Sequence, residues 1–329
     1  HSTRYADNFS GTRFMCGIVG YVGPRLASPL LLDSLKRLEY RGYDSAGIAV
    51  MNGNGVETRK APGKISELEA LVTASPVHGT LGIAHTRWAT HGAPNFVNAH
   101  PQLDCEERIA VVHNGIIENG SALRQALEDL GHTFRSDTDT EVLAHLIEET
   151  YNGVLEEAVI EALSKVEGTY GIAVVSSDDP NKIVAARKGS PLLVGLGEGE
   201  YFIASDVSAI LAHTRQVIYL DDGDLAVLDR DGYQIIDMNS SPLTKDVASI
   251  DWDLDMIERG GFSHFMLKEI FEQPDTVKNT MRGRLLPETG TAKLGGLNMT
   301  ADELLSFDNI LITACGTSWH SALIGEFLI

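Results

Sequence analysis

Residues 15–22 read Met-Cys-Gly-Ile-Val-Gly-Tyr-Val, and this stretch decides the fold. Its run from Gly17 to Val22 predicts a short buried strand, with a cysteine just before the first strand residue. Leucines at 31, 32, 35 and 38 then fall at helical spacing. The chain therefore opens with a strand that is followed by an amphipathic helix.

The rest of the first 240 residues alternates between blocks of strands and clusters of helices. Strand-like runs cover 46–51, 80–88, 108–113, 169–176, 182–187, 192–196, 201–204, 216–220 and 224–228, and helical runs cover 121–130, 138–151 and 154–166. Gly131 is placed to end the first of those helices. The glycines at 195, 197 and 199 favour a hairpin over a phosphate loop, since no helix follows at once. Consecutive blocks of this kind indicate an α+β fold with antiparallel sheets covered by helices.

The composition changes after residue 240. A turn cluster, Asn239-Ser240-Ser241-Pro242, and a locally acidic stretch predict a linker over 241–260. A helix over 263–281, an apolar strand over 309–314 and a further helix after Ser318 are expected next. One strand and one helix cannot bury their own faces, so residues 261–329 are expected to be the truncated start of a second domain.

Length, charge and cysteine content restrict the class of protein. The 329 residues favour about two domains. The formal net charge, 26 − 46 = −20, disfavours nucleic acid or an anionic membrane as a partner. Three cysteines make no disulfide framework and fit a reducing compartment, and no membrane span or secretory signal is present, so we expect a cytoplasmic protein.

Cys16 is the first candidate for chemistry. If Met15 is the initiator, its removal exposes the α-amine of Cys16, and a chain-terminal amine has a pKa of about 7.7–8.0. Such an amine can take the proton of its own thiol, which makes the thiol a nucleophile without a histidine. The alternative is a small buried structural cysteine, which would be favoured for a cysteine without further motifs.

Asn114 and Gly115 follow an apolar strand and carry two hydrogen-bond donors. A side-chain amide and a backbone N–H suit an oxyanion hole for a thiol that attacks an amide. Asn-Gly is also a common turn dipeptide, and the dipeptide alone favours that interpretation.

Arg87 and Asp139 suit the two charged ends of a free amino acid. Arg87 ends a predicted strand and can hold a carboxylate with its guanidinium fork. Asp139 lies at a helix start and can hold an ammonium group, although Asp137 or Asp139 is also expected to cap that helix.

Four histidines, at 85, 91, 100 and 113, raise the question of a metal. They lie on different predicted elements and show no paired ligand spacing. We therefore expect neither a metal nor a cofactor.

Five separated motifs together resemble the glutamine–fructose-6-phosphate aminotransferase (glucosamine-6-phosphate synthase) family. They occur in the family's order as CGIVGY at 16–21, RLEYRGYDSAG at 37–47, HTRWATHG at 85–92, HNG at 113–115 and TDTE at 138–141. The first motif alone would indicate only a class II glutamine amidotransferase. The second and third favour the hexosamine enzyme over asparagine synthetase or phosphoribosyl-pyrophosphate amidotransferase.

The resemblance implies a fold and a domain organisation. Residues 16–240 would form a four-layer αββα N-terminal-nucleophile hydrolase domain with two antiparallel sheets, behind an N-terminal extension, 1–15. Residues 261–329 would begin an α/β sugar-isomerase domain. The full-length enzyme would deliver ammonia from glutamine to fructose 6-phosphate, would need no cofactor and would be a homodimer.

The resemblance also implies roles for individual residues. Cys16 would be the nucleophile, Asn114 and Gly115 the oxyanion hole, Arg87 the carboxylate ligand and Asp139 the ammonium ligand. The remaining implied site residues are Arg41, which orders the nucleophile's surroundings, Trp88 in a mobile loop, Thr90, His91 and His100 at the pocket, and Thr317 and Ser318 at a sugar phosphate.

Two features depart from that pattern. Fifteen residues precede Cys16, and an acylated amine is no base, so we expect initiation at Met15 or a cleaved propeptide. Most of the isomerase half is missing, so we expect this chain alone to make no glucosamine 6-phosphate. A non-catalytic glutamine-binding module and an amidotransferase with another acceptor are the alternatives.

Overall fold

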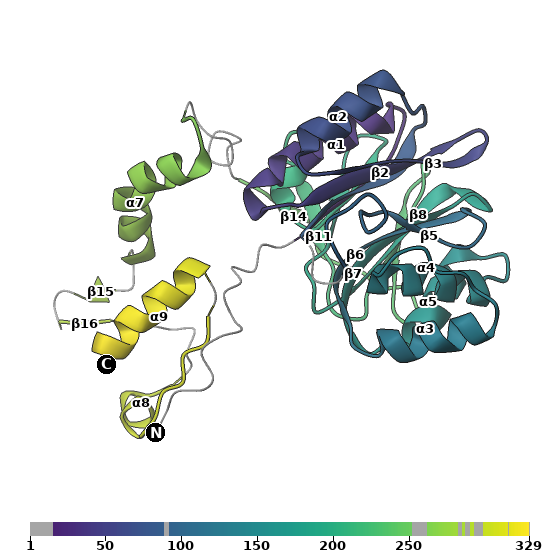
Figure 1. The fold of residues 1–329 in the computed structure, drawn as a ribbon. Helices are drawn as coiled ribbons and strands as arrows, with labels where there is room; N and C mark the ends of the chain where they lie inside the picture. The colour runs from purple at the N-terminus through teal and green to yellow at the C-terminus, as the bar shows by residue number, and fades with distance from the viewer. Residues whose placement is uncertain are drawn as a thin grey trace. The chain divides into compact units, whose positions relative to one another are not determined.

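The structure, a computed structural model, describes residues 16–88, 92–251, 262–281, 285–286, 290–292, 299–314 and 316–328. These residues fall into two compact units, one up to residue 251 and one from residue 262 (Figure 1). The first unit carries most of the residues that the sequence singles out.

Two antiparallel sheets form the centre of the first unit. The eight-stranded sheet has the order β14-β11-β9-β10-β1-β4-β2-β3, and the six-stranded sheet has the order β13-β12-β8-β7-β6-β5. The strands of the first sheet are β1 (Gly17–Val22), β2 (Ser45–Asn52), β3 (Gly55–Pro62), β4 (Leu81–Arg87), β9 (Leu193–Leu196), β10 (Tyr201–Ala204), β11 (Gln216–Tyr219) and β14 (Ala248–Ser249). Those of the second are β5 (Gln102–Leu103), β6 (Ile109–Ile117), β7 (Gly168–Ser176), β8 (Asp179–Lys188), β12 (Leu225–Leu228) and β13 (Tyr233–Ile236).

Helices cover the outer face of each sheet, which gives four layers (Figure 1). The helices α1 (Ala27–Arg37) and α2 (Ile65–Ala74) pack on the eight-stranded sheet. The six-stranded sheet is covered by α3 (Gly120–Asp129), α4 (Asp139–Thr150) and α5 (Leu155–Ser164). Two 3-10 turns, η1 (Glu39–Arg41) and η2 (Val207–Ala209), complete the unit. The predicted αββα arrangement is confirmed.

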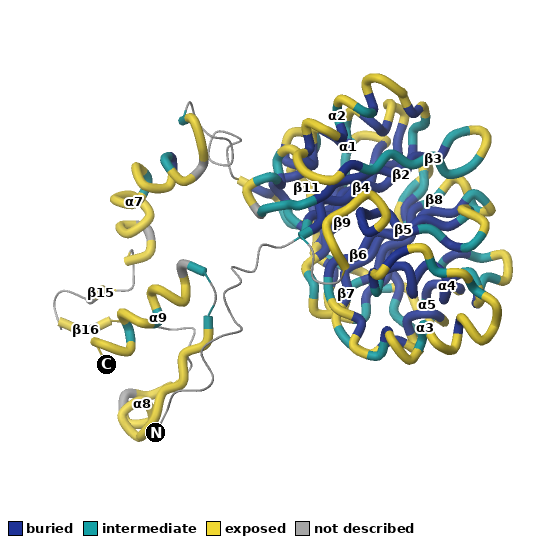
Figure 2. The backbone as a smooth tube through the Cα atoms, viewed as in Figure 1, coloured by how far each residue is buried: buried dark blue, intermediate teal, exposed yellow. Residues whose placement is uncertain are grey.

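The opening strand shows why the layers hold together. Ile18 and Val22 belong to the core between the two sheets, whereas Val19 and Tyr21 belong to the core beneath α1 and α2. Successive residues of a strand point to opposite faces, so β1 is buried on both sides. Figure 2 shows that buried residues gather along the strands at the centre of the first unit. Full burial of such an apolar side chain stabilises the fold by about 1.5–3 kcal/mol.

Local signals in the sequence place several element ends correctly. Gly131 has φ +102°, and the N–H groups of Gly131 and His132 donate to the carbonyls of Glu128 and Leu127. This is the glycine-terminated helix end expected after α3. The glycines at 195–199 lie in a hairpin, since β9 and β10 pair directly with Tyr201 opposite Leu196.

One alternative interpretation of the local structure is excluded, and two predictions are wrong. Asn114 and Gly115 form no turn, because β6 continues through them and pairs with β7 at Gly171 and Tyr170. Neither Asp137 nor Asp139 caps α4, whose N-cap is Thr138. Residues 309–314 are not a strand, since a strand needs a neighbour and the pair described in this unit is β15 with β16.

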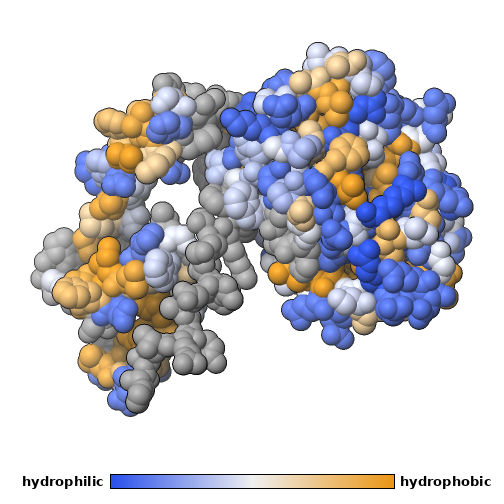
Figure 3. Space-filling model, viewed as in Figure 1, coloured by the Kyte–Doolittle hydropathy of each residue, from blue (hydrophilic) through white to orange (hydrophobic). Residues whose placement is uncertain are grey.

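The second unit consists of α7 (Phe265–Met281), β15 (Leu285–Leu286), β16 (Thr291–Ala292), α8 (Ala301–Leu305) and α9 (Gly316–Leu328). Large apolar side chains of α7 and α9 are exposed, among them Met266, Phe271, Ile324 and Phe327 (Figure 3). Within the described residues, none of the helices combines the length and the apolar character needed to cross a bilayer.

Candidate active site

Cys16 lies directly before β1, and sheet pairing brings the end of β4 beside it. Gly17 is opposite Thr86, and the Gly17 N–H donates to Thr86 Oγ1 at 3.1 Å. Arg87 and Trp88, which follow Thr86 in the sequence, therefore lie next to Cys16. The Trp88 N–H donates to Cys16 Sγ at 3.1 Å.

The Cys16 thiol is protonated near neutral pH in this environment. Burial raises its pKa, while the Trp88 N–H and the nearby Arg87 charge lower it only in part. A protonated thiol needs a base before it can attack. Within the described residues, the hydrogen bonds of Sγ go to the backbone of Trp88.

Asn114 reaches Cys16 from the other sheet. Its Nδ2 donates to the Cys16 carbonyl oxygen at 3.1 Å, so its Oδ1 faces His85 Nε2 at 2.9 Å. Because that oxygen accepts, His85 must carry its proton on Nε2. The amide orientation is therefore fixed, and its N–H groups face the cysteine.

Gly115 is a position where only glycine fits. Its φ is +136°, and a Cβ atom there would lie 2.1 Å from the Thr169 carbonyl oxygen on β7. Glycine at this position allows β6 to approach β7 closely. It also provides a backbone N–H next to the side-chain amide of Asn114.

Arg87 is buried, with 3% of its surface exposed, and lies among acidic groups. Burial lowers the pKa of its guanidinium, and Asp44, Cys16 and Asp139 act in the opposite direction. Its NH2 and NH1 groups donate to the carbonyls of Gly92 and Ala93 at 3.2 and 3.4 Å. Both distances are at the long end for hydrogen bonds, and a guanidinium pairs more strongly with a carboxylate than with a neutral carbonyl.

Asp139 is the first residue of α4 and is half-buried. Its Oδ2 accepts a hydrogen bond from the Ile117 N–H at 3.0 Å, at the end of β6. Arg87 and Asp139 therefore place opposite charges close enough to interact around Cys16. A free amino acid carries the complementary pair of charges.

Three of the four histidines singled out in the sequence, His85, His100 and His113, contact Asn114 or Thr140 beside these residues. The rings of His85 and His100 lie against each other, tilted by 36°, with centroids 4.5 Å apart. Thr140 Oγ1 lies 2.6 Å from His100 Nε2 and 3.1 Å from His113 Nδ1. Burial lowers the pKa of His85 to about 3 and that of His100 well below its usual value, so both rings are neutral.

Other predicted site residues lie at the margin of this description. Trp88 is half-buried, while Thr90, His91 and the side chains of Arg41 and Thr317 lie outside the described residues. Ser318 belongs to α9 of the second unit and is exposed.

The sequence reasoning missed one cluster of candidate ligands, Cys105, His132, His145 and Glu148. A local signal was available, since His145 and Glu148 form an H-x-x-E pair three residues apart on α4. The other two members come from separate connections, so spacing alone could not assemble the set.

Comparisons with known proteins agree on a glutamine-using class. A family model described as a glutamine amidotransferase domain matches residues 91–212. A protein of Chlorobaculum tepidum named glutamine–fructose-6-phosphate aminotransferase (isomerizing) is 55% identical over 322 residues, which are 96% of this chain and 52% of that protein. A protein of the same name from Thermus thermophilus is 54% identical over 315 residues, 96% of this chain and 51% of its own length. The chain thus spans about half the length of these curated relatives.

Two solved structures share the fold of the first unit. Glutamine phosphoribosylpyrophosphate amidotransferase from B. subtilis superposes with a TM-score of 0.60 at 27% identity, over 68% of this chain and 49% of that one. A structure titled as the allosteric regulatory enzyme of purine biosynthesis gives 0.60 at 29% identity, with the same coverage.

Proposed function

From the premise that this chain carries a glutamine amidotransferase domain on the N-terminal-nucleophile fold, we propose that Cys16 hydrolyses glutamine to glutamate and ammonia. The observation that carries the proposal is the convergence on Cys16 of Asn114 from one sheet and Arg87 from the other. A purely structural cysteine would not require an amide donor and a guanidinium group beside it.

The proposed reaction begins with the freed α-amine of Cys16, which takes the proton from Sγ. The thiolate attacks the carboxamide carbon, and the resulting oxyanion accepts hydrogen bonds from Asn114 Nδ2 and the Gly115 N–H. The C–N bond breaks as the amine returns its proton, and ammonia leaves. Water then hydrolyses the thioester, which releases glutamate and restores the thiol.

The amino-acid end of glutamine is assigned to the charged pair. Arg87 would bind the α-carboxylate in exchange for its long bonds to Gly92 and Ala93, and Asp139 would bind the α-ammonium group. His100 acts through Thr140, the neighbour of Asp139. Arg41, Trp88, Thr90 and His91 complete the proposed site.

The wider organisation follows the relatives. Residues 16–240 would be the glutaminase, 241–260 the linker and 261–329 the start of a sugar-isomerase domain, with Thr317 and Ser318 at a sugar phosphate. In the full-length protein, a homodimer, the ammonia would pass to fructose 6-phosphate to form glucosamine 6-phosphate, as the relatives' name implies.

Replacement of the nucleophile tests the reaction. The chain is expressed from Met15, and mass spectrometry checks that Cys16 is the first residue. Cys16→Ala should then release no glutamate above background, while calorimetry still shows glutamine binding. Arg87→Lys should weaken that binding, because a point charge replaces a two-pronged ligand.

Two outcomes would favour another function. If the processed wild-type chain binds glutamine without turnover, it is a non-catalytic module. If Cys16→Ala hydrolyses glutamine as fast as the wild type, the assignment of Cys16 as the nucleophile is wrong. The acceptor is tested separately, by supplying the full-length protein with fructose 6-phosphate and measuring glucosamine 6-phosphate.

A further inference from the structure

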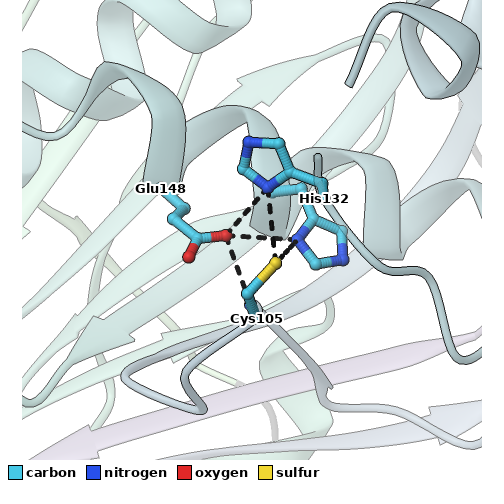
Figure 4. A group of neighbouring side chains, drawn as sticks. Cys105, His132 and Glu148 are labelled. Carbon is cyan, nitrogen blue, oxygen red and sulfur yellow. Dashed lines mark hydrogen bonds and ion pairs between the residues drawn. The ribbon is translucent and has the colours of Figure 1, made fainter. Parts of the chain in front are cut away.

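A second group of reactive side chains lies in the first unit, on connections that the proposed reaction does not use. Cys105 follows β5, His132 lies between α3 and α4, and His145 and Glu148 lie on α4. Figure 4 shows Cys105, His132 and Glu148 turned towards one another, and one ligand atom from each of the four residues lies within 4.8 Å of every other.

The two sulfur-to-nitrogen and two nitrogen-to-oxygen distances in this cluster match a tetrahedral zinc centre. Cys105 Sγ lies 3.5 Å from Nδ1 of both His132 and His145. Glu148 Oε2 lies 3.1 and 3.2 Å from the same two nitrogens. Zinc–ligand bonds of about 2.3 Å to sulfur and about 2.0–2.1 Å to nitrogen and oxygen give tetrahedral edges of about 3.6 Å (S to N) and about 3.3 Å (N to O).

The outer nitrogens of both histidines face carboxylates. His132 Nε2 is hydrogen-bonded to Glu149 Oε2 at 3.2 Å, whereas buried His145 Nε2 lies 3.7 Å from Glu141 Oε1, too far for a hydrogen bond. Glu141 is itself held by the N–H groups of Arg135 and Ser136 at 2.7 and 2.6 Å. A carboxylate behind a histidine is the usual partner of a metal-bound imidazole, because it keeps the proton on the outer nitrogen.

Without a metal, each Nδ1 can carry the proton and donate it to Glu148 Oε2. When the protons instead stay on the outer nitrogens, two Nδ1 lone pairs, a carboxylate oxygen and the thiol sulfur converge on one point. The side chains of His145, His132 and Glu148 are only 1%, 9% and 15% exposed, so water shields the centre poorly. A cation at this point would satisfy all four groups.

We propose that Cys105, His132, His145 and Glu148 bind Zn²⁺ in a closed tetrahedral site. On binding, the Cys105 thiol releases its proton to solvent and the thiolate becomes a ligand. Sulfur with two imidazoles and one carboxylate is a zinc-type ligand set, and four protein ligands leave no open position, which is typical of a structural site.

The ion would tie two separate connections to α4. It would join the chain after β5 and the segment between α3 and α4 to the second half of that helix. The first turn of the same helix carries Asp139 and Thr140 of the proposed glutamine site, about 9 Å along the axis from His145. The site therefore positions the element that presents Asp139, and the proposal stands whether or not Cys16 is active.

The first test measures zinc directly on the whole chain, kept reduced. After metal removal and dialysis against added Zn²⁺, mass spectrometry should find about one zinc ion per chain. Co²⁺ in its place should give the visible absorption of a tetrahedral centre and a thiolate-to-metal charge-transfer band. The unfolding temperature should rise with zinc.

Variants distinguish this site from incidental binding. Cys105→Ser and His132→Gln should weaken zinc binding more than about 100-fold, which exceeds the loss for an outer partner. Glu149→Gln should weaken it about 10–100-fold. The matched controls are Cys16→Ala, exposed His78→Gln and exposed Glu157→Gln, which should bind zinc as the wild type does.

The result that overturns the proposal is equally concrete. Absence of stoichiometric zinc in the reduced wild type, or equal zinc in Cys105→Ser, His132→Gln and the controls, would show that the cluster holds only protons. Circular dichroism of each variant, without metal, separates lost ligation from lost folding.

Discussion

At the scale of single residues, Asn114 has the most exacting position, since its two ends are engaged by different partners. Its Nδ2 contacts the Cys16 carbonyl oxygen and its Oδ1 contacts His85. Asn114→Ala should lower kcat for glutamine hydrolysis about 10²–10³-fold, with little change in KM, because an oxyanion donor acts in the transition state. Steady-state kinetics checks this, with exposed Asn181→Ala as the control. A rise in KM at constant kcat would instead assign Asn114 to ground-state binding.

Gly115 allows steric clash to be separated from backbone preference. Gly115 and Gly153 both have positive φ, +136° and +110°, but a Cβ atom would meet the Thr169 carbonyl only at Gly115. Gly153→Ala should therefore destabilise the fold by about 1–3 kcal/mol, and Gly115→Ala by about 3 kcal/mol or more. Urea unfolding of the two variants gives the comparison. Equal losses would mean that β6 and β7 shift apart without difficulty.

His85 gives the fold a dependence on pH. Burial lowers its pKa to about 3, against about 6.5 in the unfolded chain. Its contribution is complete above pH 6.5 and falls as the pH drops towards 3, because only the unfolded state takes up the proton. From pH 7 to pH 5, this residue alone should cost about 2 kcal/mol. His85→Gln should show a shallower fall in urea midpoints over that range, and an unchanged slope would contradict the assignment.

At the scale of elements, α4 connects the proposed glutamine site to the histidines behind it. Thr140 Oγ1 bridges His100 and His113. Thr140→Val keeps the shape but leaves two buried imidazole nitrogens without that partner, so it should destabilise the fold by about 2–4 kcal/mol. The control is Thr73→Val on α2, where an exposed hydroxyl bonds only to the Glu69 carbonyl within its own helix. It should change the free energy of unfolding by less than about 0.5 kcal/mol.

The sequence predicts elements well where the pattern is local. The run 17–22, the helices α3 to α5 and the strands β7 to β12 follow from apolar periodicity and turn residues, whereas β13 is not predicted. The pattern fails at β3, where polar residues such as Glu57 and Arg59 occupy an edge strand that is only half-buried. It also fails at β5 and β14, because a two-residue strand has no period to detect.

Features that depend on pairing are equally hidden from a single sequence. Asn-Gly at 114–115 satisfies the rules for a turn, but β7 is available as a partner and the strand continues. Residues 309–314 satisfy the rules for a strand, but no partner strand is described beside them. In both cases the presence or absence of a neighbouring strand determines the local structure.

At the scale of the whole molecule, the candidate site is assembled from segments that lie far apart in the chain. Cys16, Arg87 and Asn114 come together because β1 pairs with β4 and the two sheets stack. The motifs identify these residues by chemistry, and the fold supplies the distances. The Cys105 cluster lacks a motif that spans its members, which is why it emerges only when β5, α3 and α4 are in place.

The first unit should fold without the second, because every residue of its three core clusters lies between Ile18 and Ile250 in the sequence. The predicted linker starts at residue 241, yet β14 pairs with β11 at Gln216 and Val217. Ile250 is 8% exposed in the core, and its N–H donates to the Arg215 carbonyl at 2.9 Å. We therefore expect the boundary of the folded unit to lie beyond Ile250.

Two chains that start at Met15 test this boundary. The one that ends at Asp251 should unfold within a few degrees of the full chain, since it keeps each of the described strands of both sheets. The one that ends at Asp246 keeps Lys245 but loses β14 and Ile250, which should cost about 2–4 kcal/mol and lower the midpoint by about 5–10 °C. Thermal unfolding followed by circular dichroism distinguishes them. Equal midpoints would mean that residues 247–251 contribute nothing to the sheet, and an unfolded 15–251 chain would mean that the second unit is required for the first to fold.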